Sequence, residues 1–334
     1  MGYDEYKAVF DVAAQNIPAI REAVRDAVDK KGCDRVLFTG VGGIMMLTLP
    51  AVEFMRRQNG FPIHYELGAE LLEDMPAYID DKTLVVAPSV SGTTPETIEL
   101  MARLNELDVK ILALTGKADS PIAKAATYNV TTPMADPTSS EVVFLQTLAV
   151  ALELLGKDAG VDVEQTFAEL QKVPDVLISV KEQCEPTARK LAEHLADHDY
   201  HILTSAGNTW FEVDYYAMCI LEEMQWIRTR AVHSSDFFHG TLELVEEGVS
   251  VLILKGIGPM RALTDRVARF TPRVTDSSVV VDLEDFAMDG LSDKTQELVA
   301  PAILATVFER TSNQLEDIRN HPLTTRRYYK KMDY

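Results

Sequence analysis

Short apolar runs alternate with helix-like segments along almost the whole chain, and this alternation restricts the possible folds most strongly. In the first half, apolar runs at 35–39, 84–87 and 109–114 each precede a turn, and apolar residues at helical spacing follow the first two turns. Continuous apolar runs of this length are typical of strands that are buried on both faces of a sheet. The pattern therefore predicts an α/β protein whose parallel strands are covered by helices on both sides.

The second half repeats the plan of the first. Apolar runs at 201–204, 249–254 and 278–282 again precede turns, and a long apolar helix is expected at 139–156. We interpret this as an internal duplication that gives two tandem doubly wound parallel-sheet units with flanking helices. The expected boundaries are 1–170 for an N-terminal helix and the first unit, and 171–334 for linker helices, the second unit and a tail.

Composition and charge restrict the kind of partner. The chain has 334 residues, of which 46% are hydrophobic, and a net charge of −20, which argues against nucleic acid or an anionic membrane as the main partner. Cys33, Cys184 and Cys219 are far apart and show no CxxC spacing, so neither a disulfide framework nor a zinc site is indicated. With no leader-like N-terminus and no apolar run long enough for a membrane span, we expect a cytoplasmic protein.

The stretch PSVSGTTPET at 88–97 is rich in hydroxyl groups. It follows an apolar run, and Thr94 and Pro95 are suited to the N-cap and the first position of a helix. A turn of this kind directs backbone N–H and hydroxyl donors to one place, which favours phosphate binding. The alternative is that the stretch only caps a helix after a strand.

A helix is expected from about Phe211 to Ile227, with Glu223 at the margin of its buried face and Glu222 on the opposite, solvated side. A partly desolvated carboxylate such as that of Glu223 suits proton transfer near neutral pH. The alternative is a boundary glutamate that pairs with Arg228 or Arg230. The predicted buried face of this helix comprises Val213, Ala217, Ile220, Met224 and Ile227.

Histidines supply further candidates. His239 precedes Gly240 and an expected helix, TLELVEEG, and there it can act as an acid or base or simply cap that helix. Three other histidines lie in a highly charged segment without the HExxH pattern, so we predict a surface position for them and no metal. They are His194, His198 and His201.

Together these features resemble the sugar isomerase (SIS) family of phosphosugar enzymes, which have flavodoxin-like units. The resemblance rests on SVSGTTPET, on KADSPIAKAA, and on a glutamate followed sixteen residues later by the histidine of FFHG. Within that family, EEMQWIRTRAVHSSDFFHGTLEL and the tail HPLTTRRYYKKMDY are most similar to the ketosamine-6-phosphate deglycases. Such enzymes act on substrates such as 6-phosphofructose-aspartate and fructoselysine 6-phosphate.

The resemblance implies roles for several residues. Ser89, Ser91 and Thr94 match the phosphate-binding hydroxyls, Glu223 the proton-shuttling carboxylate, and His239 the histidine linked to ring opening. It also implies a homodimer with shared active sites and a reaction without metal or redox cofactor.

Weaker substrate contacts are expected at three further positions. The loop Gly42-Gly43-Ile44 lacks the serine that many relatives carry, so backbone N–H groups near Gly43 would have to serve. Arg228 is a candidate for binding a carboxylate of the amino acid moiety, although a surface role is equally compatible with the sequence. In the basic tail, a residue such as Arg327 would offset the phosphate charge if the tail folds over the site.

Three functions follow as hypotheses. The first is a deglycase that cleaves a fructosamine 6-phosphate to glucose 6-phosphate and a free amine. The second is an aminosugar-phosphate deaminase or isomerase, which would release fructose 6-phosphate and ammonia. The third is a phosphosugar sensor without catalysis, which is disfavoured because the thirty N-terminal residues are too short for a DNA-binding domain.

Overall fold

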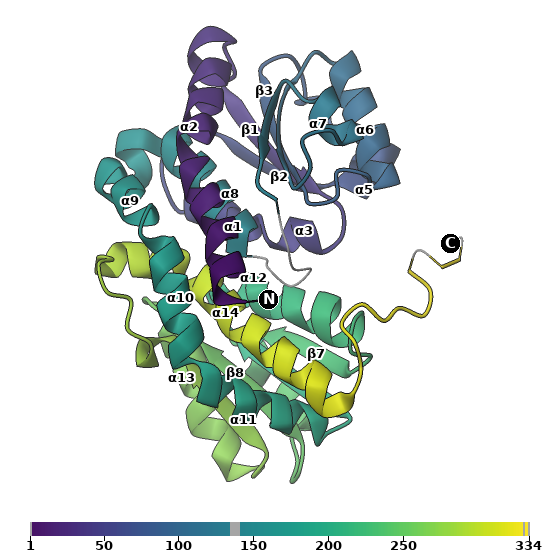
Figure 1. The fold of residues 1–334 in the computed structure, drawn as a ribbon, viewed down its shortest axis with the longest axis vertical. Helices are drawn as coiled ribbons and strands as arrows, with labels where there is room; N and C mark the ends of the chain where they lie inside the picture. Colours follow the sequence, from purple (N-terminus) through teal and green to yellow (C-terminus); the bar gives the residue numbers. More distant parts are fainter. Residues whose placement is uncertain (1, 134–140, 330, 333–334) are drawn as a thin grey trace. The chain divides into compact units, whose positions relative to one another are not determined.

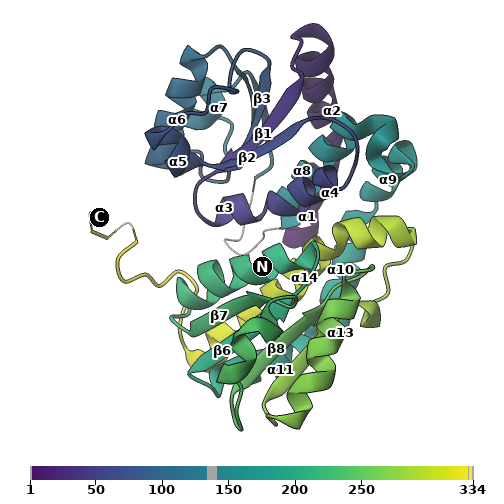
Figure 2. The same ribbon diagram turned by 180° about the vertical axis from the view of Figure 1, so that it is seen from behind.

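The chain folds into two compact units, shown in the computed structural model of Figures 1 and 2, which describes residues 2–133, 141–329 and 331–332. The first unit extends to Val176 and also includes Gly290–Thr295. The second comprises Leu177–Asp289 and the chain from Gln296 onward.

A parallel sheet forms the centre of the first unit. Its strand order is β2-β1-β3-β4-β5, and every pairing is parallel. The three expected strands are confirmed, whereas β2 and β5 were not predicted, because they are short, partly exposed edge segments without a continuous apolar run. The strands are β1 (Arg35–Gly40), β2 (Ile63–Leu67), β3 (Thr83–Ser89), β4 (Lys110–Thr115) and β5 (Tyr128–Thr131).

Helices cover both faces of this sheet, with α5, α6 and α7 on one side and α1, α2 and α8 on the other (Figure 1). Leu37, Val85 and Ile111 of the strands share a core with Leu100 of α6 and Ile122 of α7. The expected apolar helix at 139–156 is α8, although Ser139 and Ser140 lie outside the described residues. The helices are α1 (Tyr3–Gln15), α2 (Ile17–Arg25), α3 (Gly43–Met46), α4 (Leu49–Arg56), α5 (Gly68–Glu73), α6 (Pro95–Glu106), α7 (Pro121–Ala125), α8 (Glu141–Leu155) and α9 (Val163–Leu170), with a π-helical segment at Asp26–Lys30 and a 3₁₀ turn at Gly156–Ala159.

The second unit has the same plan with one strand fewer in its described sheet. Its order β7-β6-β8-β9, again all parallel, matches β2-β1-β3-β4 of the first unit, so the predicted duplication of doubly wound units is confirmed. Segment 228–233, for which no strand was predicted, is the edge strand β7 and pairs with β6. The strands are β6 (Tyr200–Ser205), β7 (Arg228–His233), β8 (Ser250–Lys255) and β9 (Ser278–Asp282).

Several connections of the second unit are shorter than the sequence suggested. The expected helix TLELVEEG is a single 3₁₀ turn at Thr241–Leu244, which follows another at Phe237–His239. Two long helices, α10 and α14, have residues in both units. The helices are α10 (Val173–Gln183), α11 (Glu185–Ala196), α12 (Thr209–Tyr215), α13 (Arg261–Phe270) and α14 (Asp293–Arg319), with 3₁₀ turns at Thr271–Arg273 and Leu283–Asp285. No described helix combines the length and the apolar character that a membrane span requires.

The helix expected at 211–227 is shorter and partly π-helical. It consists of α12 and a π-helical segment, Tyr216–Glu222, and all five residues of the predicted apolar face are buried. Tyr216 stacks on Phe308 of α14 at 3.8 Å between ring centroids, which fixes the π-helical segment against that helix. Trp226, with a φ of 56°, turns the chain into β7.

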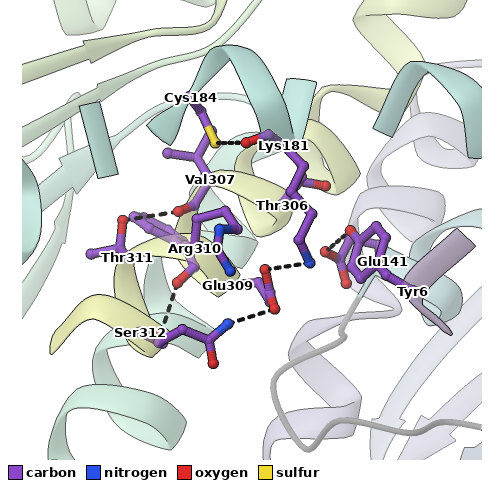
Figure 3. A network of polar contacts seen from close by, with 12 residues as sticks. Tyr6, Glu141, Lys181, Cys184, Thr306, Val307, Glu309, Arg310, Thr311 and Ser312 are labelled. Carbon is purple, nitrogen blue, oxygen red and sulfur yellow. Dashed lines mark hydrogen bonds and ion pairs between the residues drawn. The ribbon is translucent and has the colours of Figure 1, made fainter. Parts of the chain in front are cut away.

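An ion pair lies inside the second unit. Lys181 of α10 and Glu309 of α14 are both fully buried, and 2.8 Å separates Lys181 Nζ from Glu309 Oε2 (Figure 3). Asn313 Nδ2 also donates a hydrogen bond of 2.6 Å to Glu309 Oε1. Each charge therefore depends on a nearby polar partner, because an isolated buried charge is strongly unfavourable.

Replacing Lys181 by Met should lower the free energy of unfolding by about 3–5 kcal/mol, because the Glu309 carboxylate then stays buried without its cation. Urea unfolding followed by circular dichroism would measure the loss. Lys190→Met, at an exposed position of α11, is the matched control and should change stability by less than about 0.5 kcal/mol. Equal stabilities of the two variants would contradict this account of the ion pair.

Candidate functional site

The hydroxyl-rich turn of the first unit lies at the carboxyl end of β3. Ser89 is the last residue of that strand and is buried, whereas Ser91 is partly exposed. Thr94 occupies the N-cap position of α6 with Pro95 as the first helical residue, as predicted, but its hydroxyl forms no capping hydrogen bond. The side chain of Thr94 is therefore not used by the helix.

Glycines hold this turn against the loop that follows β4. Gly92, with a φ of 62°, lies so close to Ser120 that an added Cβ would be 2.2 Å from the Ser120 hydroxyl oxygen. The Gly116 N–H donates to the Val90 carbonyl at 3.0 Å, so the two loops are joined through their backbones. The arrangement fixes the hydroxyl groups relative to the strand ends.

Within the described part of the chain, the hydroxyls of Ser89 and Thr94 have no hydrogen-bond partner, and Ser91 Oγ accepts only a 3.3 Å bond from the Thr93 N–H. All three residues lie between the end of β3 and the N-terminus of α6. Such a combination suits an anion with several oxygen atoms.

The glycine loop after β1 is the second feature of this edge. Gly42 has a φ of 66°, and α3 begins at Gly43, which is partly buried. An added Cβ at Gly40 would be 2.8 Å from a methyl carbon of Ile44. The loop can thus offer backbone N–H groups to a ligand but no hydroxyl.

In the second unit, a pocket of about 810 Å³ lies between the end of the π-helical segment, the start of β7 and the C-terminal tail. It contains three of the predicted site residues, Glu223, Arg228 and Arg327, but His239 does not line it. The lining residues are Glu222, Glu223, Trp226, Ile227, Arg228, Thr229, Arg326, Arg327, Tyr328 and Tyr329.

Glu223 follows the π-helical segment, and its side chain is 36% exposed. Its ion-pair partner is neither Arg228 nor Arg230, as the alternative interpretation had it, but Arg326, whose Nε lies 2.8 Å from Glu223 Oε1. The neighbouring Glu222 is exposed, as predicted, and accepts a hydrogen bond of 2.5 Å from the Thr229 hydroxyl. The two adjacent glutamates therefore have different surroundings.

The other arginines of the pocket have no carboxylate partner among the described residues. Arg228 is exposed at the start of β7, and the Arg327 guanidinium lies over the Trp226 ring at 3.9 Å from its centroid. An exposed cation next to an aromatic face can receive an anionic group of a ligand. Of the basic tail, Lys330 lies outside the described residues.

His239 is exposed at the end of a 3₁₀ turn, where its backbone N–H donates to the Asp236 carbonyl at 2.8 Å. Its imidazole forms no hydrogen bond within the described residues, so the ring is accessible to another molecule.

The prediction that His194, His198 and His201 lie on the surface is wrong for His201, which is fully buried in β6. His194 Nε2 and His201 Nδ1 both contact Ser250 Oγ, at 2.8 and 2.7 Å. Burial lowers the pKa of His194 and of His201 to about 4, so both rings are neutral at pH 7. The charges of the neighbouring residues concealed the apolar face of the helix and strand that carry these histidines.

No group of three or more His, Cys, Asp or Glu side chains in the described ranges is placed to hold a metal ion.

In the second unit, the segment that follows β8 carries charges in place of the hydroxyls that follow β3. Lys255 at the end of β8 and Arg261 at the start of α13 both bond to Asp282 at the end of β9; Lys255 Nζ lies 2.8 Å from Asp282 Oδ2. Burial by itself raises the pKa of Asp282, but the hydrogen bonds from Arg261 and Lys255 outweigh it and lower the pKa to about 2. The cations at this edge are thus neutralised within the protein.

Asp282→Asn should destabilise the protein by about 1–2 kcal/mol at pH 7. Because the folded-state pKa of Asp282 lies below its ordinary value of 3.8, its contribution is complete above about pH 4 and is lost as the pH falls toward 2. Urea unfolding at several pH values would show the difference from wild type shrinking by about half at pH 3. Asp285→Asn, at an exposed neighbouring position, is the control. A loss as large at pH 3 as at pH 7 would contradict the assignment.

Comparison with known proteins adds independent information. The family model of the SIS domain matches residues 32–155. A fructosamine deglycase of Bacillus subtilis is 29% identical over 322 residues, which cover 94% of this chain and 97% of the relative. A fructoselysine 6-phosphate deglycase of Escherichia coli is 27% identical and covers 95% of this chain and 92% of its own. The resemblance drawn from the sequence motifs is therefore confirmed.

Two solved structures have a fold similar to that of this chain over almost its whole length. A Salmonella typhimurium protein described as a phosphosugar isomerase has a TM-score of 0.87 at 25% identity, covering 96% of this chain and 97% of its own. A Bacillus subtilis protein described in the same way has a TM-score of 0.83 at 27% identity, covering 96% and 99%.

Proposed function

We propose that this chain, whose residues 32–155 match the family model of the SIS domain, is a deglycase that cleaves a fructosamine 6-phosphate to glucose 6-phosphate and a free amine. The observation that carries the proposal is the partly exposed Glu223 carboxylate, which lines a pocket rich in cationic and aromatic side chains. Similarity to two deglycases over more than nine-tenths of the chain supports the same reaction class.

The chemistry requires one base that serves two carbon atoms. In the open-chain ketosamine, C2 is a carbonyl and C1 carries the amine. Glu223 takes a proton from C1, the electron pair forms the C1–C2 double bond of an enolamine, and the C2 oxygen gains a proton. Return of a proton to C2 places the double bond between C1 and nitrogen, and water hydrolyses this imine to glucose 6-phosphate and the amine. A carboxylate in a half-exposed position is suited to such a transfer.

The remaining site residues have binding and proton-transfer roles in this proposal. Ser89, Ser91 and Thr94 bind the phosphate, together with the loop at Gly43, and the exposed Arg228 and Arg327 bind anionic groups of the conjugate. His239 assists ring opening or imine hydrolysis in the site of a partner subunit, so the enzyme works as a homodimer. This arrangement is supported by the exposure of His239 and by its absence from the pocket that contains Glu223 in its own unit.

The reaction is tested by incubating the purified protein with 6-phosphofructose-aspartate, fructoselysine 6-phosphate and glucosamine 6-phosphate in separate assays. Coupling enzymes then distinguish glucose 6-phosphate from fructose 6-phosphate. Glucose 6-phosphate from either conjugate is the expected result. Fructose 6-phosphate from the aminosugar alone would favour a deaminase, and no product from any of the three would reject the deglycase.

Glu223→Gln should lower kcat by roughly a hundredfold or more, since the amide cannot accept the C1 proton. The measurement is steady-state release of glucose 6-phosphate, with thermal unfolding recorded to show that the variant is folded. Glu106→Gln is the control, because Glu106 is an exposed glutamate of α6 that does not line the pocket, and it should keep wild-type activity. Unchanged turnover of Glu223→Gln would exclude this residue as the base.

A further inference from the structure

The start of the C-terminal tail is fixed to the residues around Glu223 by several independent contacts. The buried Gln225 donates from Nε2 to the His321 carbonyl at 2.7 Å. The Trp226 ring meets the His321 ring edge-on at 4.5 Å between centroids, and Arg327 covers the Trp226 ring at 3.9 Å. The turn after α14 thus has a defined position next to the proposed base.

Arg326 is oriented by that same turn. Its Nη1 donates to the Leu323 carbonyl at 2.7 Å and to the Thr325 carbonyl at 2.9 Å. The Thr325 N–H in turn donates to the Pro322 carbonyl at 2.8 Å, and the Arg326 side chain is only 16% exposed. The guanidinium is therefore held by its own backbone before it meets a partner.

The Nε–H of Arg326 donates to Glu223 Oε1 at 2.8 Å. The other carboxylate oxygen, Oε2, has no hydrogen bond within the described part of the chain. A carboxylate held at one oxygen by a fixed donor keeps the second oxygen in a defined direction, as proton abstraction from carbon requires. The family resemblance implied that a tail cation such as Arg327 offsets the substrate phosphate, whereas Arg326 donates to the glutamate.

We infer that Arg326 is a positioning residue that orients the Glu223 carboxylate for proton transfer. The inference rests on the proposed role of Glu223 as the base. It differs from a purely phosphate-binding role because Nε and Nη1 of Arg326 donate to protein oxygens, which leaves only Nη2 without a hydrogen bond among the described residues. The inference also predicts that loss of the Arg326 side chain lowers kcat and leaves KM almost unchanged.

The test measures kcat and KM for release of glucose 6-phosphate in wild type, Arg326→Ala and Arg326→Lys. The substrate is whichever of 6-phosphofructose-aspartate and fructoselysine 6-phosphate the wild type cleaves faster. Arg326→Ala should lower kcat by roughly 10- to 100-fold with little change in KM, because a misoriented base is slow while binding remains. Arg326→Lys keeps a cation and should recover part of the loss. Arg230→Ala, an exposed arginine of β7 outside the pocket, serves as the control.

A double-mutant cycle decides whether Arg326 acts through Glu223. The variant Glu223→Gln/Arg326→Ala should be no slower than Glu223→Gln alone, since the positioned group is already absent. Additive losses, or a raised KM with unchanged kcat in Arg326→Ala, would overturn the inference while leaving the deglycase intact. A wild-type protein that releases no glucose 6-phosphate would instead reject the proposed function, and the inference with it.

Discussion

Parallel pairing of the strands is the constraint on which the site depends. Every strand pairing in the described part of the chain is parallel, so each connection must cross the sheet and return to the same starting edge. The carboxyl ends of β1, β3 and β4 therefore lie together at one edge of the first sheet. The glycine loop, the hydroxyl-rich turn and the Ser120 loop meet at that edge for this reason, although some eighty residues separate the first from the last.

The two units show how one plan can carry different chemistry. After β3, the first unit places free hydroxyls and a helix N-terminus, which can receive an anion. After β8, the second unit places Lys255 and Arg261, and Asp282 neutralises both of them. Ionic groups that satisfy one another stabilise the edge but leave little capacity to bind phosphate. Among the described residues, the hydroxyl-rich turn after β3 thus has no counterpart after β8, where ion pairs stabilise the edge.

Whether a feature could be predicted from the sequence depends on how far apart along the chain the interacting residues lie. Central strands such as β3 and β8 were predictable because burial on both faces requires continuous apolar residues. Edge strands such as β7, RTRAVH, lack that signal because one long side is open to solvent. The burial of His201 was missed for a related reason, since its charged neighbours belong to the exposed side of the same segment. The Thr94 N-cap position was predicted correctly because Pro95 marks the first helical residue locally, although the Thr94 hydroxyl forms no capping hydrogen bond.

The environment of Glu223 lies beyond what local patterns can predict. Helical spacing placed it at the margin of a buried face, and the structure agrees, but its partner Arg326 is 103 residues further along the chain. The basic run of the tail was the only signal, and it did not indicate which cation would turn toward the glutamate. An ion pair whose members are 16% and 36% exposed contributes little to stability, because water screens it. This ion pair contributes little to folding, yet backbone and ring contacts of the tail hold Arg326 in place. We therefore attribute the contact to the orientation that it gives the carboxylate. On this view the C-terminal turn belongs to the site as much as the π-helical segment that carries Glu223.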